Sequence, residues 1–243
     1  MNKLFFTQRE NWKEEVIKAK EKKGVSVFNF MNSHDLYIFS RSHFFRETLD
    51  QNSVIIPDGF IVSLFLSISS LKRIRRMSGT GFMKSFFGKK ELTSGKHLFL
   101  GSGEKDVLVL IQKFPYLEKK NLLFYNPPKI DGYFFDEGEI RKIANLIKNE
   151  KIDFVWVGLG CPKQNFLAYT LTKEIGWKKV IFFNVGAAMD FVLGKKKKAP
   201  TFFLKTGTEW LYRLVTDFSH SKKKVWRSFA SLPNLNKIQV KEK

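Results

Sequence analysis

The sequence predicts an α/β protein with a mostly parallel sheet, helices on both faces of the sheet and a basic helical appendage at the C-terminus. Between residues 25 and 185, short apolar runs alternate with amphipathic or charged segments, the order that gives parallel strands joined by right-handed helical crossovers. The run 154–159 is apolar almost throughout, as expected in a sheet covered on both faces. After Gly194, basic and aromatic residues replace this alternation. We therefore expect an α/β core over 1–194 and an appendage over 195–243.

The expected strands and helices follow one another along the chain. A charged segment with Trp12, Val16 and Ile17 on one face predicts a surface helix, which Gly24 ends. Runs rich in β-formers predict strands, and cap-forming residues predict helix starts. The expected strands are 25–30, 53–57, 96–100, 121–125, 154–159 and 180–185, and the expected helices are 9–23, one from about 32, 60–71, 104–114, 137–148 and one from about 162. We expect 233–243 to form a loose tail.

Composition narrows the class of protein. The chain has 243 residues, of which 43% are hydrophobic, so it can bury a substantial core. Its 26 phenylalanines predict buried aromatic layers or an apolar contact surface. The single cysteine, Cys161, excludes an internal disulfide framework and a multi-cysteine metal site, and it favours a reducing compartment. Because the four histidines also lack metal-ligand spacing, we expect no metal.

The charge is large and uneven. The formal net charge is +20, and residues 195–243 contribute 13 Lys and Arg against 3 Asp and Glu, a net of +10. A positive electrostatic field of this size attracts polyanionic partners such as nucleic acid, anionic lipid or phosphorylated substrates. No RNA- or DNA-binding motif accompanies it. The segments 208–215 and 222–229 are expected helices with aromatic and basic faces. They either pack on the core as a helical pair or lie on an anionic membrane, and the charge asymmetry favours the membrane.

No segment is expected to span a membrane or to act as a signal peptide. The start, 1–6, is too short an apolar run, and 8–23 is charged. The longest apolar stretch, 60–71, contains four serines and is shorter than the roughly 20 residues that a bilayer requires. We expect a cytosolic protein, either free or peripheral on the inner face of the cell membrane.

Polar residues follow the first two expected strands, and in open α/β sheets ligands bind where strands end. Asp58 follows 53–57, and a lone carboxylate there either takes part in catalysis or caps the next helix. Asn32 follows 25–30, and its amide either caps a helix or faces a ligand.

Three further segments offer groups for a phosphate or a sugar. Gly101-Ser102-Gly103 stands between a strand and a helix, the layout of a phosphate cradle, although it lacks the full dinucleotide and P-loop patterns. Lys163 and Gln164 are expected in the first turn of a helix, where they lie either beside the strand ends or in solvent. Arg76 closes the basic run 72–76 before an expected glycine turn at 78–81, and it either contacts a phosphate or lies on a solvated face.

Over roughly residues 24 to 230 the chain resembles the WecG/TagA/CpsF family of bacterial glycosyltransferases. Each matching motif is short, but all occur in the order that the family has. They are the strand leading to Asn32, Pro57-Asp58-Gly59, Arg76 with Gly79, Phe99-Leu100-Gly101, Gly132-Tyr133-Phe134, Val157-Gly158-Leu159-Gly160 with Pro162-Lys163-Gln164, Val185-Gly186-Ala187 with Asp190-Phe191 and Gly194, Ala199-Pro200, and Glu209-Trp210-Leu211-Tyr212-Arg213-Leu214.

The resemblance implies an activity and a fold. Members transfer an N-acetylmannosamine-type sugar from a UDP donor to a polyprenyl-diphosphate-linked sugar on the inner membrane face, during synthesis of cell-surface polysaccharide. The β linkage that they form inverts the anomeric centre. The implied fold is a Rossmann-like core with a C-terminal appendage that engages the membrane. The reaction of such members needs no metal and no cofactor besides the UDP-sugar, which is the donor substrate.

The resemblance also assigns roles to residues of this chain. Asp58 is the implied catalytic base, because an inverting transfer needs one group to take the proton of the acceptor hydroxyl. Positive groups and N–H donors stabilise the diphosphate leaving group. The expected substrate-binding residues are Asn32, Arg76, Gly101, Ser102, Gly103, Tyr133, Lys163, Gln164 and Arg213.

The chain departs from the family pattern at several motifs. Phe30 stands where a threonine is usual, Gly81 near the place of an acid, Asn165 in place of a glutamate and Lys198 in place of an arginine, and the usual Glu-Pro is replaced around Asp217-Phe218. Two alternatives stay open beside the transferase, and these departures suggest the second of them. One is a basic nucleic-acid-binding α/β protein, and the other is a nucleotide-sugar binder that has lost catalysis, against which the retained Asp58 argues.

Overall fold

The structure is a computed structural model that describes residues 2–7, 9–49, 53–176, 178–196, 199–200, 203, 215 and 238–242, with only the backbone described for 2–5, 9 and 238–242. Within these residues the core is one six-stranded sheet in the order β3-β2-β7-β6-β4-β5, and every pair of neighbouring strands is parallel. The strands are β2 (Val25–Met31), β3 (Ser53–Pro57), β4 (His97–Leu100), β5 (Leu122–Tyr125), β6 (Phe154–Val157) and β7 (Val180–Asn184). The parallel α/β prediction is confirmed.

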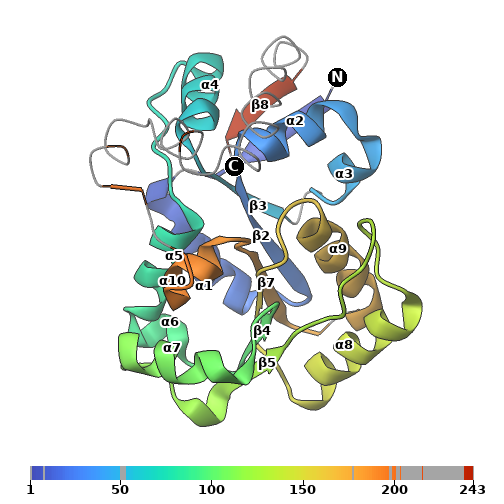
Figure 1. The fold of residues 1–243 in the computed structure, drawn as a ribbon. Coiled ribbons are helices and arrows are strands. Elements are labelled where there is room, and N and C mark those ends of the chain that lie inside the picture. Colours follow the sequence, from blue (N-terminus) through green and yellow to red (C-terminus); the bar gives the residue numbers. More distant parts are fainter. Residues whose placement is uncertain are drawn as a thin grey trace.

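Helices cover both faces of this sheet, as Figure 1 shows. The helices are α1 (Trp12–Glu21), α2 (Ser33–Arg41), α3 (His43–Glu47), α4 (Phe60–Ser70), α5 (Gly79–Phe87), α6 (Lys90–Thr93), α7 (Val107–Lys113), α8 (Glu137–Asn149), α9 (Lys163–Ile175) and α10 (Ala188–Leu193), with short 3-10 turns at η1 (Arg9–Asn11), η2 (Glu104–Asp106) and η3 (Lys119–Asn121). Side chains alternate across each strand, so Phe28 packs with α1, α5 and α10, whereas Val27 packs with α8 and α9.

The phenylalanines form a buried aromatic layer on the α5 face of the sheet. The rings of Trp156 and Phe183 stack with centroids 4.4 Å apart, and Phe82 of α5 lies 5.1 Å from Phe183. Phe86 and Phe87 of the same helix are also fully buried. Aromatic rings bury large apolar areas and gain a further contribution when they meet at such distances. Much of the high phenylalanine content therefore serves this layer, as one of the two sequence interpretations predicted.

Two local expectations were wrong. Residues 79–81 are the first turn of α5 rather than a glycine turn, and the Ser78 hydroxyl caps that helix by accepting the N–H of Gly81 at 3.1 Å. Residues 238–242 form strand β8 (Ile238–Glu242) rather than a loose tail, and β8 pairs in parallel with β1 (Asn2–Phe6), which the sequence did not predict as a strand. Because these two strands lie at opposite ends of the chain, a local pattern carries little information about their pairing.

The expected appendage, 195–243, falls almost entirely outside the described residues, so the boundary at 194 stays a prediction. Its first residues are nevertheless bound to the core: Lys195 Nζ lies 2.6 Å from Asp106 Oδ2, and Lys196 Nζ lies 2.7 Å from Asp190 Oδ2. Among the described helices, no helix has the length and apolar character needed to cross a membrane.

Candidate active site at the carboxyl edge of the sheet

Asp58 lies at the carboxyl end of β3, between two helices. Its backbone N–H donates to the carbonyl of Met31 at 2.7 Å, which extends the pairing of β2 and β3 by one residue. The N–H of Met77 donates to the carbonyl of Pro57 at 2.8 Å and so brings the start of α5 to the same strand end. There the Gly79 N–H donates to Asp58 Oδ2 at 3.4 Å. The half-buried carboxylate therefore lies at the N-terminus of α5, where the helix dipole stabilises negative charge.

Asn32 lies next to Asp58 at this edge, because Met31 and Pro57 are paired residues of β2 and β3. The Asn32 side chain accepts from the backbone N–H of His34 at 2.9 Å and of Asp35 at 3.4 Å, and the Asn32 N–H donates to Asp35 Oδ2 at 2.8 Å. This capping box shows that Asn32 caps α2, which was one of its two interpretations. The cap fixes the orientation of the Asn32 side chain, and its contact with a ligand stays a prediction.

The Gly101–Gly103 turn lies at the carboxyl end of β4 and is closed by groups of the protein itself. The Gly101 N–H donates to the carbonyl of Tyr125 at 2.9 Å, and the Gly103 N–H donates to Asp106 Oδ2 at 3.1 Å. The buried Ser102 hydroxyl donates to the sulfur of Met189 at 2.7 Å. The predicted phosphate contacts of this turn are therefore not preformed at these three groups.

Helix α9 brings Gln164 to the same edge. Gln164 is buried, with 6% of its surface exposed, and its Nε2 donates to the carbonyl of Asn184 at 3.2 Å. The interpretation of Gln164 as a solvated residue is therefore wrong. Lys163 is half-buried, and its Nζ donates to the carbonyl of Ile130 at 2.9 Å. Lys163 thus fixes the loop that follows β5, and a direct contact with substrate stays a prediction.

Three buried asparagines beneath this edge were missed by the sequence interpretation. Asn29 Oδ1 accepts from Asn184 Nδ2 at 2.7 Å and from Asn165 Nδ2 at 2.9 Å. Asn29 and Asn184 are paired residues of β2 and β7, so the cluster joins these two neighbouring strands to α9. Beside it lies a cavity of about 10 Å³ lined in part by Asn29, Gln164 and Asn165. The signal in the sequence is an amide inside an otherwise apolar strand, which is costly unless it is hydrogen-bonded.

The remaining predicted site residues are Tyr133, Arg76 and Arg213. Tyr133 is exposed, and its ring centroid lies 6.1 Å from that of Phe166 on α9. The neighbouring Phe134 stacks on Phe166 at 4.8 Å, so aromatic contacts and Lys163 together hold the 126–136 loop against α9. Arg76 is half-buried and precedes α5. Arg213 lies outside the described residues.

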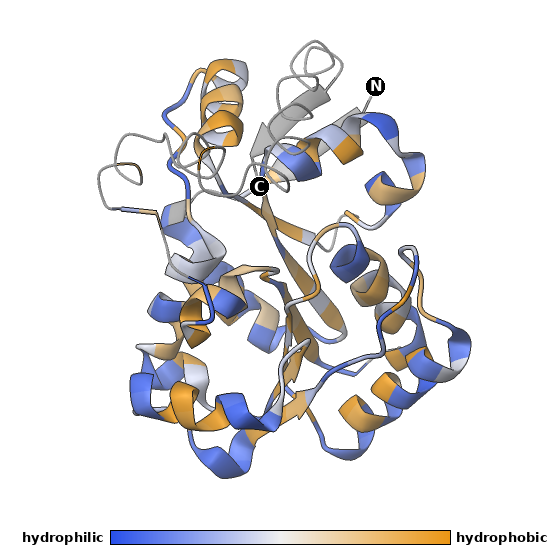
Figure 2. Ribbon diagram, viewed as in Figure 1, coloured by the Kyte–Doolittle hydropathy of each residue, from blue (hydrophilic) through white to orange (hydrophobic). Residues whose placement is uncertain are grey.

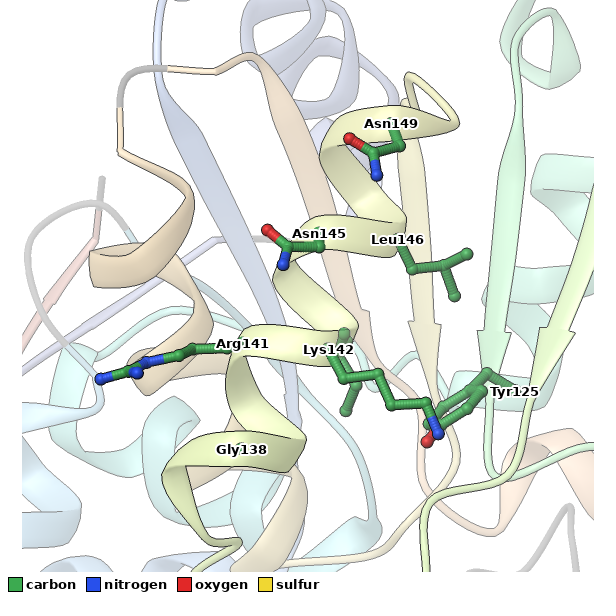
Figure 3. Close-up of a pocket in the computed structure, with 8 residues that line it drawn as sticks. Tyr125, Gly138, Arg141, Lys142, Asn145, Leu146 and Asn149 are labelled. Atoms are coloured by element: carbon green, nitrogen blue, oxygen red, sulfur yellow. The ribbon is translucent and has the colours of Figure 1, made fainter.

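A hollow of about 580 Å³ is an open groove elsewhere on the molecule. It runs along α8 beside Tyr125, as Figure 3 shows, with Lys142 directed toward the Tyr125 ring. None of the predicted site residues lines it, and its wall carries no carboxylate. The residues that the structure describes also contain no group of three His, Cys, Asp or Glu side chains that could hold a metal ion. We therefore assign the candidate site to the carboxyl edge of the sheet.

The parallel sheet, its two helical layers and the polar side chains at its carboxyl edge define a Rossmann-like α/β protein. The comparison with protein families narrows this class. The family described as "Glycosyl transferase WecG/TagA/CpsF family" matches residues 4–238, and the chain belongs to this family.

Two curated relatives carry the same functional name, N-acetylglucosaminyldiphosphoundecaprenol N-acetyl-beta-D-mannosaminyltransferase. The protein of Bacillus spizizenii (strain W23) is 26% identical over 193 residues, covering 78% of this chain and 68% of the relative. The protein of Staphylococcus aureus (strain NCTC 8325) is 27% identical over 198 residues, covering 79% of this chain and 69% of the relative. The family resemblance expected from the sequence motifs is therefore confirmed.

Proposed function

We propose that this protein is an inverting, metal-independent hexosyltransferase that moves an N-acetylmannosamine-type sugar from a UDP donor to a polyprenyl-diphosphate-linked sugar. The observation that carries the proposal is the position of Asp58, a half-buried carboxylate at the carboxyl edge of the sheet beside Asn32 and the start of α5. Membership of the family and the names of the two relatives support the reaction class, the sugar that is transferred and the lipid-linked acceptor.

The chemistry requires one base and one stabilised leaving group. The acceptor hydroxyl oxygen attacks the anomeric carbon from the face opposite the diphosphate. A new C–O bond forms, the bond from the anomeric carbon to the phosphate oxygen breaks, and UDP leaves with the electron pair. The Asp58 carboxylate takes the hydroxyl proton, a contribution of about 10²–10⁴-fold for a positioned base. The Gly79 N–H keeps the carboxylate in place for this step.

Binding residues are proposed from the same edge. Asn32 and Gln164 hold the donor sugar or its nucleotide, with Tyr133 and Lys163 on the loop side. Arg76 and Arg213 neutralise charge that develops on the diphosphate, since fixed positive groups stabilise a leaving oxyanion more than they stabilise the ground state. The Gly101 and Gly103 N–H groups would contact a phosphate only after they exchange partners, because the protein itself engages them.

The reaction is proposed to occur on the inner membrane face. The basic residues of 195–243, with a net charge of +10, would hold the enzyme on anionic lipid. This attachment should weaken as salt is raised, because screening shortens the range of each charge.

The test is a transfer assay with UDP-N-acetylmannosamine and a short lipid-diphosphate-linked N-acetylglucosamine, read as UDP release with and without acceptor. The Asp58→Asn enzyme should fold normally, bind UDP and lose transfer by at least about 100-fold. Asp131→Asn, at an exposed position on the 126–136 loop, is the matched control for loss of one carboxylate. Near-normal turnover by Asp58→Asn would overturn the assignment of the base. Turnover only with a different UDP-sugar would change the donor but keep the chemistry.

A further inference from the structure

Helix α4 carries an apolar stripe on its outer face. Phe60, Leu64, Ile68 and Leu71 are 48%, 47%, 67% and 93% exposed. At 3.6 residues per turn the helical positions 60, 64 and 68 fall within an arc of roughly 80°, and Leu71 follows as the left-handed C-cap of the helix. The buried residues of the helix, Val62, Ser63 and Leu66, lie on the opposite side and pack toward β3 and α2.

The composition of α4 is unusual for a helix at the surface. Its eleven residues, Phe60–Ser70, contain no charged side chain. A water-facing helix normally carries charged or polar residues on its outer side, and a helix that is apolar all round is normally buried in protein or lipid. Figure 2 shows the contrast: α4 is mostly hydrophobic and lies at the periphery of the molecule, whereas hydrophilic and hydrophobic residues alternate along α8.

Positive charge borders the stripe. Lys72 and Arg73 follow directly after Leu71 and are exposed, and the exposed Arg75 pairs with Glu10 at 3.6 Å. From Phe60 to Lys90 the chain has seven Lys and Arg and no Asp or Glu. An apolar strip with a basic border matches an anionic lipid surface, where the apolar groups enter the acyl boundary and the cations meet the headgroups. A surface that only faces water needs neither an apolar strip nor a basic border next to it.

We infer that α4 and the basic residues after it form a membrane-docking surface that lies on an anionic bilayer, distinct from residues 195–243. The helix is about 16 Å long at 1.5 Å per residue, about half the thickness of a hydrocarbon core, so it lies in the interface and does not span it. Since Phe60 is two residues after Asp58, this surface places the carboxyl edge of the sheet at the lipid headgroups. That last step rests on the proposed function, because a lipid-linked acceptor must reach Asp58 from the membrane.

The test uses the full chain and vesicles of phosphatidylcholine with or without phosphatidylglycerol. The double substitution Leu64→Ser and Ile68→Ser removes apolar surface without changing charge, and it should weaken partition into mixed vesicles about tenfold or more. Leu108→Ser is the matched control, because Leu108 on α7 is 57% exposed on a different helix, and its partition should stay within about twofold. Equal losses in both proteins, or no loss in the double variant, would overturn the inference.

A charge substitution tests the basic border separately. Arg73→Gln should weaken binding to the phosphatidylglycerol vesicles about fivefold, the effect of roughly one surface charge, with little change on phosphatidylcholine alone. Lys151→Gln, which removes an exposed charge from the loop before β6, should leave both unchanged. Equal effects of the two substitutions would mean that only net charge matters, and this would contradict a localised surface.

An attached fluorophore reports the contact directly. In a Cys161→Ser background, a solvent-sensitive dye on Ile68→Cys should shift to the blue when anionic vesicles are added, whereas the same dye on Leu108→Cys should not.

A dye at 68 that is already blue-shifted in free protein and does not respond to vesicles would mean that the chain itself covers α4. A lower sedimenting mass of the Leu64→Ser and Ile68→Ser protein, with vesicle partition unchanged, would mean that a second copy covers it. Either result overturns the inference. None of these readouts depends on turnover, so an inactive enzyme that still docks would overturn the proposed function alone.

Discussion

The carboxylate of Asp58 accepts a hydrogen bond from the backbone N–H of Gly79 at 3.4 Å, across 21 positions of sequence. This contact joins the end of β3 to the first turn of α5 and places one negative charge at a helix N-terminus. Such a position favours a charged carboxylate, which is the form that accepts a proton. The geometry of the base therefore depends on how closely α5 approaches the sheet.

Gly79→Ala should disturb this contact. A methyl group at Gly79 would lie 3.0 Å from the Cβ of Ala188 and 3.4 Å from the carbonyl of Val185, so α5 must move away from α10. We expect a lower turnover number with a smaller change in KM, and a loss of stability of about 1–3 kcal/mol from overpacking. Steady-state kinetics and urea unfolding measure the two effects.

Gly138→Ala is the control for this substitution. It adds the same methyl group in α8, where the nearest atom is the Asp136 carboxylate oxygen at 3.1 Å. Activity should be unchanged, and stability should be equal or slightly higher because alanine favours helix. An active, fully stable Gly79→Ala enzyme would show that the close approach of α5 is not required.

Most of the core could be predicted from the sequence because each strand is recognisable from its own residues. The buried strands are apolar runs. Asp58 and Asn32 follow β3 and β2 directly, and Gln164 lies in the first turn of the helix after β6. Helix α5 was missed because Gly79 and Gly81 favour a turn, whereas Gly79 is needed for its contact with Ala188 rather than for its backbone freedom. Tertiary contacts of this kind leave no local pattern.

The amide cluster under the site was missed for a different reason. Asn29 pairs with Asn184 in the sheet and with Asn165 on α9, and residues so distant in sequence cannot be matched without the fold. Asn29 and Asn184 each stand among apolar neighbours, whereas Asn165 follows Lys163 and Gln164 in the first turn of α9. The departure at Asn165 from the usual glutamate acquires a meaning only in the structure, where its Nδ2 donates to Asn29.

Replacing Asn29 tests how much that cluster contributes to the stability of the fold. Asn29→Leu removes the acceptor of two buried N–H groups, those of Asn165 and Asn184, and leaves both unpaired. Each unpaired buried group costs about 1–3 kcal/mol, so the free energy of unfolding should fall by about 2–6 kcal/mol. The control Asn145→Leu replaces an exposed amide on α8. It should change the free energy of unfolding by less than about 0.5 kcal/mol. A small effect of Asn29→Leu in chemical denaturation would show that the cluster adapts without its centre.

His97 gives the fold a dependence on pH. Burial lowers the pKa of His97 from 6.5 to about 4, with a smaller lowering from Lys20, against an opposing hydrogen bond to the carbonyl of Thr93. The indole N–H of Trp156 donates to Nδ1 at 3.1 Å, and Nε2 lies 3.0 Å from the Thr93 carbonyl. Since the indole can only donate, Nδ1 is the acceptor and the neutral ring carries its proton on Nε2.

The direction of this pH dependence follows from whether the folded or the unfolded state binds more protons. Between pH 6.5 and about 4 the unfolded chain protonates His97 and the folded chain does not, so stability falls as pH falls through this range. The loss is complete below about pH 4 and amounts to roughly 3 kcal/mol at 1.4 kcal/mol per pH unit. Thermal unfolding from pH 7 to 4 measures the sum over all groups, and His97→Gln should flatten the slope. Imidazole nitrogen NMR isolates the ring: a change to the charged form above pH 6 would contradict this assignment.

The last prediction concerns the two ion pairs that bind the start of 195–243 to the core. Lys195 meets Asp106, whose side chain is 5% exposed, and the Asp106 carboxylate also accepts from the Gly103 N–H. Lys196 meets Asp190 at a similar distance, but these side chains are 57% and 34% exposed. The two pairs therefore differ chiefly in how far water screens them.

Double-mutant cycles should separate the pairs. Lys195→Ala leaves a buried carboxylate with less compensation, so we expect a loss on the order of 1–2 kcal/mol and a clear coupling energy with Asp106→Asn. Lys196→Ala with Asp190→Asn should give a coupling of only about 0–1 kcal/mol, as for exposed pairs. Raising the salt concentration should reduce the second coupling more than the first. Equal couplings at all salt concentrations would contradict burial as the cause. Because Asp106 also holds the turn that contains Gly103, a strong first coupling would mean that residues just beyond Gly194 stabilise one side of the candidate site.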